Sequence, residues 1–249
     1  MQYPFIRPQY YFSLFKDIVG FVKQPHNQPN LEKSAKWKTY DTIGLFIVKM
    51  ILLIPLILLF AVFEGPENIQ KSNMAERFSP IALLVIGGMI LPLVEEIAFR
   101  LSLVFHPIYF SLSSSALMYY FLTKAIFYTK ISAVDESFAT RVLIAIATGI
   151  FLSFILHIKV IKEKMTKFWA THFRSIFYIT CLIFAWMHIT KYELIWLNVL
   201  LLPILTLPQL MSAIIYAYTR VSFGFKYPLF LHIAMNTVAI GISLLPFAD

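Results

Sequence analysis

Residues 91–100 read LPLVEEIAFR, and they place two adjacent carboxylates and an arginine inside an apolar stretch of the chain. The fourteen residues before Glu95, IALLVIGGMILPLV, contain no charged side chain. A charge at the centre of a bilayer costs roughly 2.5 to 3.5 kcal/mol on insertion scales. This stretch therefore predicts a membrane-embedded helix in which a specific arrangement offsets the cost of three charges.

The helical period divides these three charges between two faces. Successive residues of an α-helix are about 100° apart, so Glu96 and Arg100 share a face and are expected to form an ion pair. Glu95 is expected to point elsewhere and to remain the spare carboxylate. An alternative is that all three side chains form a structural ion-pair cluster, because buried ionisable residues also hold helical bundles together.

The composition indicates an integral membrane protein. Of 249 residues, 59% are hydrophobic and only 14% are charged, which leaves too few polar side chains to cover a soluble domain. We predict an all-α fold, a polytopic bundle of transmembrane helices. The sequence divides into an N-terminal cytoplasmic or interfacial region, residues 1–42, and one membrane-embedded domain, residues 43–249.

About seven apolar segments are predicted to span the membrane, within a range of six to eight. They are residues 43–63, the segment that begins at Pro80, and residues 111–128, 139–160, 175–190, 193–219 and 227–247. Segment 111–128 is a weak span because it contains three serines and Lys124. Pro203 and Pro208 predict that segment 193–219 is broken into two helical pieces.

Individual residues inside the first two spans carry further predictions. Lys49 is expected to snorkel toward the end of its span. Gly87 and Gly88 permit a close contact with another helix. Pro92 leaves a backbone carbonyl of the second span without its intrahelical donor.

An amphipathic helix is predicted before the first span. In residues 9–24, apolar and charged side chains fall on opposite sides of a helix with a period of about 3.6 residues. The apolar side comprises Phe12, Phe15, Val19 and Val22, and the charged side Lys16, Asp17 and Lys23. Such a helix is expected to lie in the membrane interface.

The formal net charge of +8 is spread between apolar segments rather than gathered in one patch with aromatic residues. We therefore expect no nucleic-acid partner, and we expect the basic loops to meet anionic membrane lipid. Fourteen Lys and Arg residues fall in loops on the side of the N-terminus and five on the other side. By the positive-inside rule the N-terminus is cytoplasmic, and we expect the protein in a bacterial cytoplasmic membrane.

Three more polar side chains stand in apolar segments, namely His188, His232 and Asn236. His232 and Asn236 share a helix face at i and i+4. Phe184 has the same spacing to His188, which lets its ring pack beneath the imidazole. A single histidine in an apolar helix is more often a packing residue than a base. Two histidines, a spare carboxylate and a carboxamide together form a set that can activate water and stabilise an oxyanion.

These residues form three motifs, Glu95-Glu96-x-x-x-Arg100, Phe184-x-x-x-His188 and His232-x-x-x-Asn236. In this order they resemble the motifs of the CPBP family, which comprises CAAX proteases and bacteriocin-processing enzymes and is also called the Abi family. Its members are intramembrane endopeptidases and include the type II CAAX prenyl proteases. The resemblance covers about residues 80–245 and leaves the N-terminal region unexplained.

The resemblance implies an enzyme that hydrolyses peptide bonds of hydrophobic or membrane-anchored substrates. Glu95 would activate the attacking water together with His188. His232 and Asn236 would bind the carbonyl oxygen as it becomes negative. The supporting residues would be Glu96, Arg100 and Phe184.

One feature departs from the family pattern. The 93 residues from Glu95 to His188 are longer than the usual spacing, as though a helical hairpin were inserted. Segments 111–128 and 139–160 are the candidates for that hairpin. The departure affects the expected topology and the entry of substrate, and it leaves the catalytic assignment unchanged.

Other interpretations of the same residues stay open. A zinc ion held by Glu95, His188 and His232 is conceivable, but asparagine is a poor zinc ligand and a glutamate with a histidine can activate water unaided. We therefore expect no metal or other cofactor. From another class of protein, a non-catalytic membrane scaffold, an immunity factor or a small transporter could keep these polar side chains to bind a partner or an ion.

Overall fold

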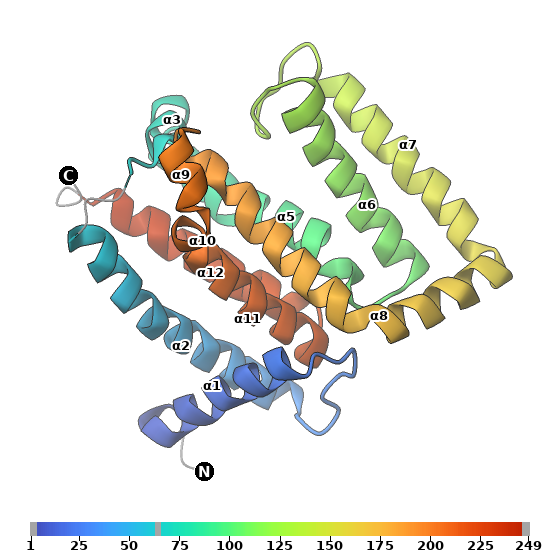
Figure 1. The fold of residues 1–249 in the computed structure, drawn as a ribbon, viewed down its shortest axis with the longest axis horizontal. Coiled ribbons are helices and arrows are strands. Elements are labelled where there is room, and N and C mark those ends of the chain that lie inside the picture. The colour runs from blue at the N-terminus through green and yellow to red at the C-terminus, as the bar shows by residue number, and fades with distance from the viewer. Residues whose placement is uncertain (1–3, 63–65, 246–249) are drawn as a thin grey trace.

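The structure is a computed structural model that describes residues 4–62 and 66–245, and every regular element in these ranges is helical (Figure 1). The all-α prediction is therefore confirmed. Residue 63, at the end of the first expected span, and residues 246–247, at the end of the last, lie outside the described residues.

Four helical segments of the described chain are long and apolar enough to cross a membrane. They are Ala35–Phe60, Pro80–Leu103, Phe138–His157 and Lys159–Lys191. The other expected spans coincide with shorter or interrupted helices. Helix length and composition thus indicate a helical membrane protein with four candidate spans in the described chain.

The N-terminal helix belongs to the main core. After a 3-10 turn, η1 (Pro4–Ile6), helix α1 (Pro8–Lys23) packs across one end of α2 (Ala35–Val62), at the bottom of Figure 1. The expected boundary at residue 42 falls inside α2.

The face of α1 that packs differs from the expected one. Its buried residues are Leu14, Ile18 and Phe21, which join the core shared with α2 and the C-terminal helices. Phe12 is 57% exposed and Phe15 37% exposed, so the first half of the predicted apolar stripe faces outward, whereas Val22 packs partly against the core. The packed face is rotated by about 100° from that stripe, because both faces of this helix carry apolar residues.

The second span consists of three joined pieces. The short helix α3 (Ile69–Arg77) precedes it. The span follows as α4 (Pro80–Val85), the π-helix η2 (Ile86–Ile90) and α5 (Leu91–Phe99). In η2 the Leu91 N–H bonds to the Ile86 carbonyl, and the same register would pair the Gly87 carbonyl with residue 92. Because Pro92 has no N–H, the Gly87 carbonyl lacks an intrahelical donor.

Helix α12 (Lys226–Ser243) packs closely on this span at the two glycines. A Cβ atom on Gly87 would lie 2.9 Å from Ile240 Cδ1, and one on Gly88 would lie 3.0 Å from Thr237 Oγ1. Backbones approach this closely where no side chain separates them. The predicted close contact at Gly87 and Gly88 is confirmed.

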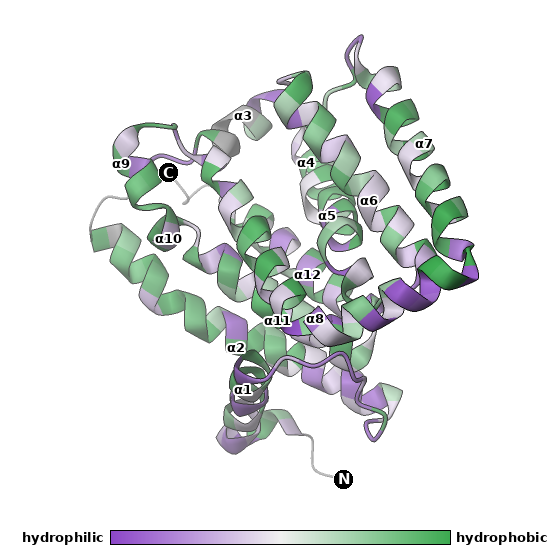
Figure 2. Ribbon diagram, turned by 45° about the vertical axis from the view of Figure 1, so that its right-hand side comes forward, coloured by the Kyte–Doolittle hydropathy of each residue, from purple (hydrophilic) through white to green (hydrophobic). Residues whose placement is uncertain are grey.

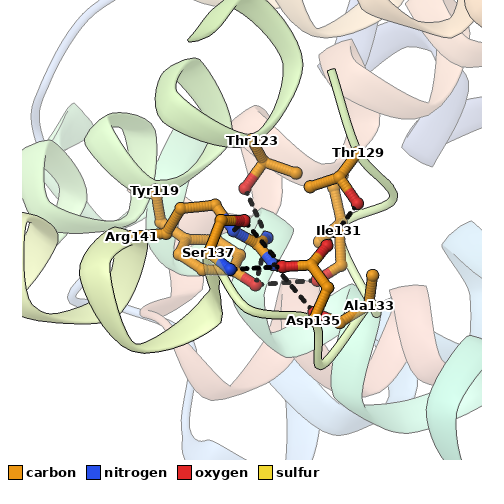
Figure 3. A network of polar contacts seen from close by, with 8 residues as sticks. All are labelled: Tyr119, Thr123, Thr129, Ile131, Ala133, Asp135, Ser137 and Arg141. Atoms are coloured by element: carbon orange, nitrogen blue, oxygen red, sulfur yellow. Dashed lines mark hydrogen bonds and ion pairs between the residues drawn. The ribbon is translucent and has the colours of Figure 1, made fainter. Parts of the chain in front are cut away.

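A helical hairpin follows the second span. After η3 (Leu101–Leu103), α6 (Pro107–Phe121) with its π-helical end η4 (Leu122–Ile126) packs along α7 (Phe138–His157), to one side of the other helices (Figure 1). The hairpin occupies the chain between the first and second motifs. A buried arginine, Arg141, ties its connecting loop to both helices (Figure 3).

The last third of the chain is one long helix followed by a broken one. Helix α8 (Lys159–Trp186) has non-helical dihedral angles at His172 and ends in the 3-10 helix η5 (Met187–Lys191). Segment 193–219 contains α9 (Trp196–Leu200), α10 (Leu202–Leu205) and the start of α11 (Leu207–Phe223). Pro203 and Pro208 stand near the beginning of α10 and α11, so the break predicted from them is present, with three pieces instead of two.

Polar and apolar residues are segregated along the molecule. Figure 2 shows hydrophilic residues on α1 and at the start of α8, and hydrophobic residues along much of α2 and α7. Large apolar side chains on the outer faces of α2 and α7 are exposed, namely Ile51, Ile54, Ile57, Leu58, Leu143, Ile146, Ile150, Phe151 and Phe154. These helix faces have the character expected of lipid-facing surface.

Candidate active site

The side chains of the three motifs come from three elements that meet in the interior. Helix α5 carries the two glutamates, the end of α8 and η5 carry Phe184 and His188, and α12 carries His232 and Asn236. Helices α5 and α12 pack directly against each other, and α5 also contacts α8. Residues separated by up to about 140 positions in the sequence therefore lie in one region.

His232 lies between the two glutamates. Its Nδ1 is 2.8 Å from Glu96 Oε1, and its Nε2 is 3.6 Å from Glu95 Oε2. The Glu96 side chain is fully buried, whereas that of Glu95 is 19% exposed. Glu95 stays outside the pair of Glu96 with Arg100, since among the described residues its ion-pair partner is His232. Both glutamates nevertheless meet at His232, because the two nitrogens of one imidazole ring reach carboxylates on two adjacent residues.

The expected ion pair between Glu96 and Arg100 is present but long, with Arg100 Nε 3.8 Å from Glu96 Oε1. The guanidinium carbon of Arg100 lies 3.7 Å from the centre of the Phe184 ring, a cation–π contact. Three buried atoms of this pair have no hydrogen-bond partner among the described residues: Glu96 Oε2, Arg100 Nη1 and Arg100 Nη2. Unpaired buried polar atoms are costly, so hydrogen bonds from water or from a polar group of a ligand would stabilise them.

Phe184 links the two histidines. Its ring centre is 4.7 Å from that of His188 and 6.3 Å from that of His232. His188 Nδ1 is 2.7 Å from the Phe184 carbonyl oxygen, which orients the imidazole and leaves Nε2 as its open nitrogen. His188 forms no ion pair with Glu95 among the contacts of the described residues, so the geometry joins Glu95 to His232 more closely than to His188.

Asn236 is tied to the backbone of the second span. Its Nδ2 donates a hydrogen bond of 3.1 Å to the Gly87 carbonyl, which the π-helical register and Pro92 leave without an intrahelical donor. Asn236 thus completes the hydrogen bonding of an irregular helix. One N–H of its carboxamide remains for any other acceptor.

Two residues outside the motifs extend the site. Lys49 is buried, and its Nζ donates a hydrogen bond of 2.6 Å to the Tyr216 hydroxyl. The prediction that Lys49 snorkels toward the end of its span is therefore wrong. The Tyr216 ring stacks on His232, with centres 4.7 Å apart and planes 29° apart. A lysine inside an apolar span is itself a signal of a polar interior. Tyr216 gives no such signal, because tyrosines occur throughout the chain.

A third such residue is Lys191, on the same 3-10 helix as His188. Residues i and i+3 of a 3-10 helix lie on the same side, so Lys191 follows His188 along one edge. Its charge acts electrostatically on both Glu95 and His188. The motif pattern did not include this residue.

In residues 4–62 and 66–245, no group of three or more His, Cys, Asp or Glu side chains is arranged to hold a metal ion. Each nitrogen of His232 faces a carboxylate, and Nδ1 of His188 faces a carbonyl oxygen.

Comparisons of the chain with protein-family models, with curated proteins and with solved structures found no match. The likeness to the CPBP family consequently depends on the three motifs.

Proposed function

We propose that this protein is an intramembrane endopeptidase that hydrolyses peptide bonds of hydrophobic or membrane-anchored substrates. The observation that carries the proposal is His232 held between Glu95 and Glu96, beside buried Arg100 donors that have no partner. An ion-pair cluster with a purely structural role would be expected to satisfy those donors. The likeness of the three motifs to the CPBP family supports the same conclusion.

Glu95 is the proposed general base, because it is the more exposed of the two carboxylates. It takes one proton from a water molecule, whose oxygen bonds to the carbonyl carbon of the substrate. The carbon–nitrogen bond then breaks, and the proton on Glu95 passes to the leaving amine nitrogen. His188 would help to orient the water through Nε2.

Charge developing on the carbonyl oxygen requires hydrogen-bond donors. His232 can donate from Nε2 only as the doubly protonated imidazole, since its Nδ1 faces Glu96. The free N–H of Asn236 is the second proposed donor. Glu96, Arg100 and Phe184 hold these groups in place.

The proposed topology has about seven crossings with a cytoplasmic N-terminus in a bacterial cytoplasmic membrane. Supporting a cytoplasmic position for both, α1 and the start of α8 are rich in hydrophilic residues (Figure 2). Helix α1 would lie in the interface, with Phe12 and Phe15 toward lipid. Anionic lipid headgroups would contact the basic first half of α8.

The decisive experiment uses the purified protein in liposomes with a panel of quenched fluorescent peptides, each carrying a membrane anchor. We expect cleavage of at least one peptide, and a loss of about 10³-fold or more in rate for Glu95→Gln and for His188→Ala. Glu163→Gln, an exposed glutamate on α8, is the matched control and should retain the full rate. Full activity of Glu95→Gln on a cleaved peptide would refute the mechanism.

Two alternatives give different outcomes in the same assay. A zinc-dependent protease would lose its activity on treatment with 1,10-phenanthroline, whereas the proposed enzyme would keep it. A non-catalytic scaffold, immunity factor or small transporter would cleave no peptide. The hydrogen bonds that join Glu96 to His232 and Asn236 to the Gly87 carbonyl also hold helices together. A non-catalytic protein could keep these residues for that purpose alone.

A further inference from the structure

Helix α6 brings another polar group to the neighbourhood of Glu95. The side chain of Tyr120 is buried, with 5% of the residue exposed, and its buried hydroxyl has no hydrogen-bond partner in residues 4–62 and 66–245. Buried tyrosine hydroxyls usually find a partner, so an open one marks a place for water or for a polar group of a ligand.

The position of Tyr120 is fixed by contacts between α6 and the second span. The Ser113 hydroxyl of α6 donates a hydrogen bond of 2.7 Å to the Ile97 carbonyl. The Tyr120 ring packs edge-on against Phe99, with centres 6.3 Å apart. Phe99 in turn packs against Phe184, so Tyr120 joins the aromatic layer that supports the histidines.

The hydroxyl faces the charged part of the site. Helix α6 packs against α5, which carries Glu95, and against the neighbouring η3. The charges of Glu95 and, with opposite sign, Arg100 act on the Tyr120 hydroxyl, so the hydroxyl lies toward this face of α6.

Few hydrogen-bond donors near Glu95 lack an acceptor among the described residues. His232 Nδ1 is engaged by Glu96, and one N–H of Asn236 is engaged by Gly87. Among the described residues, Arg100 and Tyr120 carry the buried donors of this region that have no partner. Arg100 is covered by the ring of Phe184, whereas Tyr120 has a single rotatable O–H.

We propose that the Tyr120 hydroxyl donates a hydrogen bond to the carbonyl oxygen of the scissile peptide and is a further catalytic residue of the proposed endopeptidase. This inference rests on the proposed function. Tyr120 keeps its proton throughout, and the hydrogen bond shortens as negative charge develops on the oxygen.

The proposal gives the α6–α7 hairpin a part in the reaction. Arg141 of α7 donates hydrogen bonds to Tyr119 and Thr123, one residue before and three residues after Tyr120 (Figure 3). These bonds hold the segment of α6 that presents the hydroxyl. The stretch that lengthens the spacing between the first two motifs would thus supply a donor.

Tyr120→Phe is the test, because it removes only the hydroxyl and keeps the ring against Phe99. On the most rapidly cleaved peptide of the liposome panel, we expect kcat to fall by about 10²- to 10³-fold with little change in KM. Tyr11→Phe on α1 is the control: its hydroxyl donates a hydrogen bond of 2.9 Å to the Phe5 carbonyl, outside the segment that Arg141 holds, so kcat should be unchanged.

A second readout separates catalysis from packing. A difluoromethyl ketone of the same peptide forms a hydrate that resembles the tetrahedral intermediate. Tyr120→Phe should weaken its binding by about 10²-fold and leave binding of the corresponding alcohol unchanged. Wild-type kcat and wild-type binding of the ketone in Tyr120→Phe would overturn the proposal.

The same measurements distinguish the proposed endopeptidase activity from the proposed role of Tyr120. If Glu95→Gln is inactive while Tyr120→Phe is fully active, the endopeptidase stands and the role of Tyr120 is refuted. If no peptide of the panel is cleaved, both proposals fail.

Discussion

Two buried arginines, Arg100 on the second span and Arg141 on α7, are 2% and 0% exposed, yet their surroundings differ completely. Arg141 donates all five of its N–H groups, at 2.9 to 3.1 Å, to Tyr119, Thr123, Ala133, Asp135 and Ser137 (Figure 3). Arg100 lies 3.8 Å from Glu96 and 3.7 Å from the centre of the Phe184 ring, and its Nη1 and Nη2 find no hydrogen-bond partner in the described part of the chain.

The difference separates an arginine whose N–H groups are all bonded within the protein from one whose N–H groups can still bind water or a ligand. A buried guanidinium costs least when every N–H is bonded, as around Arg141. Open donors beside two carboxylates and a histidine are unfavourable for stability alone. They are the arrangement expected where water or substrate completes the hydrogen bonding.

The largest effect is expected when the two arginines are truncated separately. Arg141→Ala should destabilise the protein by about 3 kcal/mol, because buried Thr123 and its neighbours lose their donor. Arg100→Ala should cost less, about 1 to 2 kcal/mol, since Glu96 keeps His232 at 2.8 Å. Thermal unfolding in detergent, followed by size-exclusion chromatography, measures both.

Exposed Arg174 on α8 provides the control, and Arg174→Ala should leave the unfolding temperature unchanged. Catalysis should respond in the opposite order, with Arg100→Ala slower per folded molecule than Arg141→Ala. Equal destabilisation by the two buried substitutions would remove the distinction between the two arginines.

A smaller loss of stability is expected when the hydrogen bond from Asn236 to the π-helical part of the second span is removed. Asn236→Ala should cost about 1 kcal/mol, because the buried Gly87 carbonyl loses its donor. Pro92→Ala introduces an N–H that can bond within the helix, so Asn236→Ala should cost less in that background. A double-mutant cycle in unfolding temperature measures the coupling, and additive effects would argue against this role of Asn236.

The smallest expected effect is a pH-dependent change in the stability of the loop between η4 and α7, to which Arg141 donates hydrogen bonds. Hydrogen bonds from Ser137 and then Thr129, with Arg141 contributing less, hold the pKa of Asp135 below its usual range. The folded-state pKa is therefore lower than the unfolded one. The ionised carboxylate stabilises the loop above the unfolded value, about 3.9, and this contribution is lost as pH falls through the folded value.

Hydrogen exchange of residues 127–137, corrected for intrinsic rates, tests this dependence. Protection should be constant from pH 7 to about pH 5 and decrease below about pH 4. Asp135→Asn should lower protection at pH 7 and remove the decrease at low pH. An unchanged pH profile in Asp135→Asn would place the acid sensitivity elsewhere.

Much of the fold could be predicted from local periodicity. The helical class, the shared face of Glu96 and Arg100, the breaks before Pro203 and Pro208, and the close contact at Gly87 each depend on residues near one another in the chain. Packing of α1 could not be predicted, because apolar side chains occur around much of that helix. The burial of Lys49 also escaped prediction, since its partner Tyr216 lies 167 residues away.

The sequence by itself determined which residues are polar within apolar helices, and therefore which side chains need a partner. Only the tertiary structure decided the partners: His232 between both glutamates, Asn236 on the Gly87 carbonyl, Phe184 under Arg100, and Tyr120 without any. The reason is physical. In a lipid environment the outward and inward faces of a helix are similarly apolar, so hydropathy does not indicate which face packs. The contacts between helices are settled by shape and by the few polar groups that must be paired.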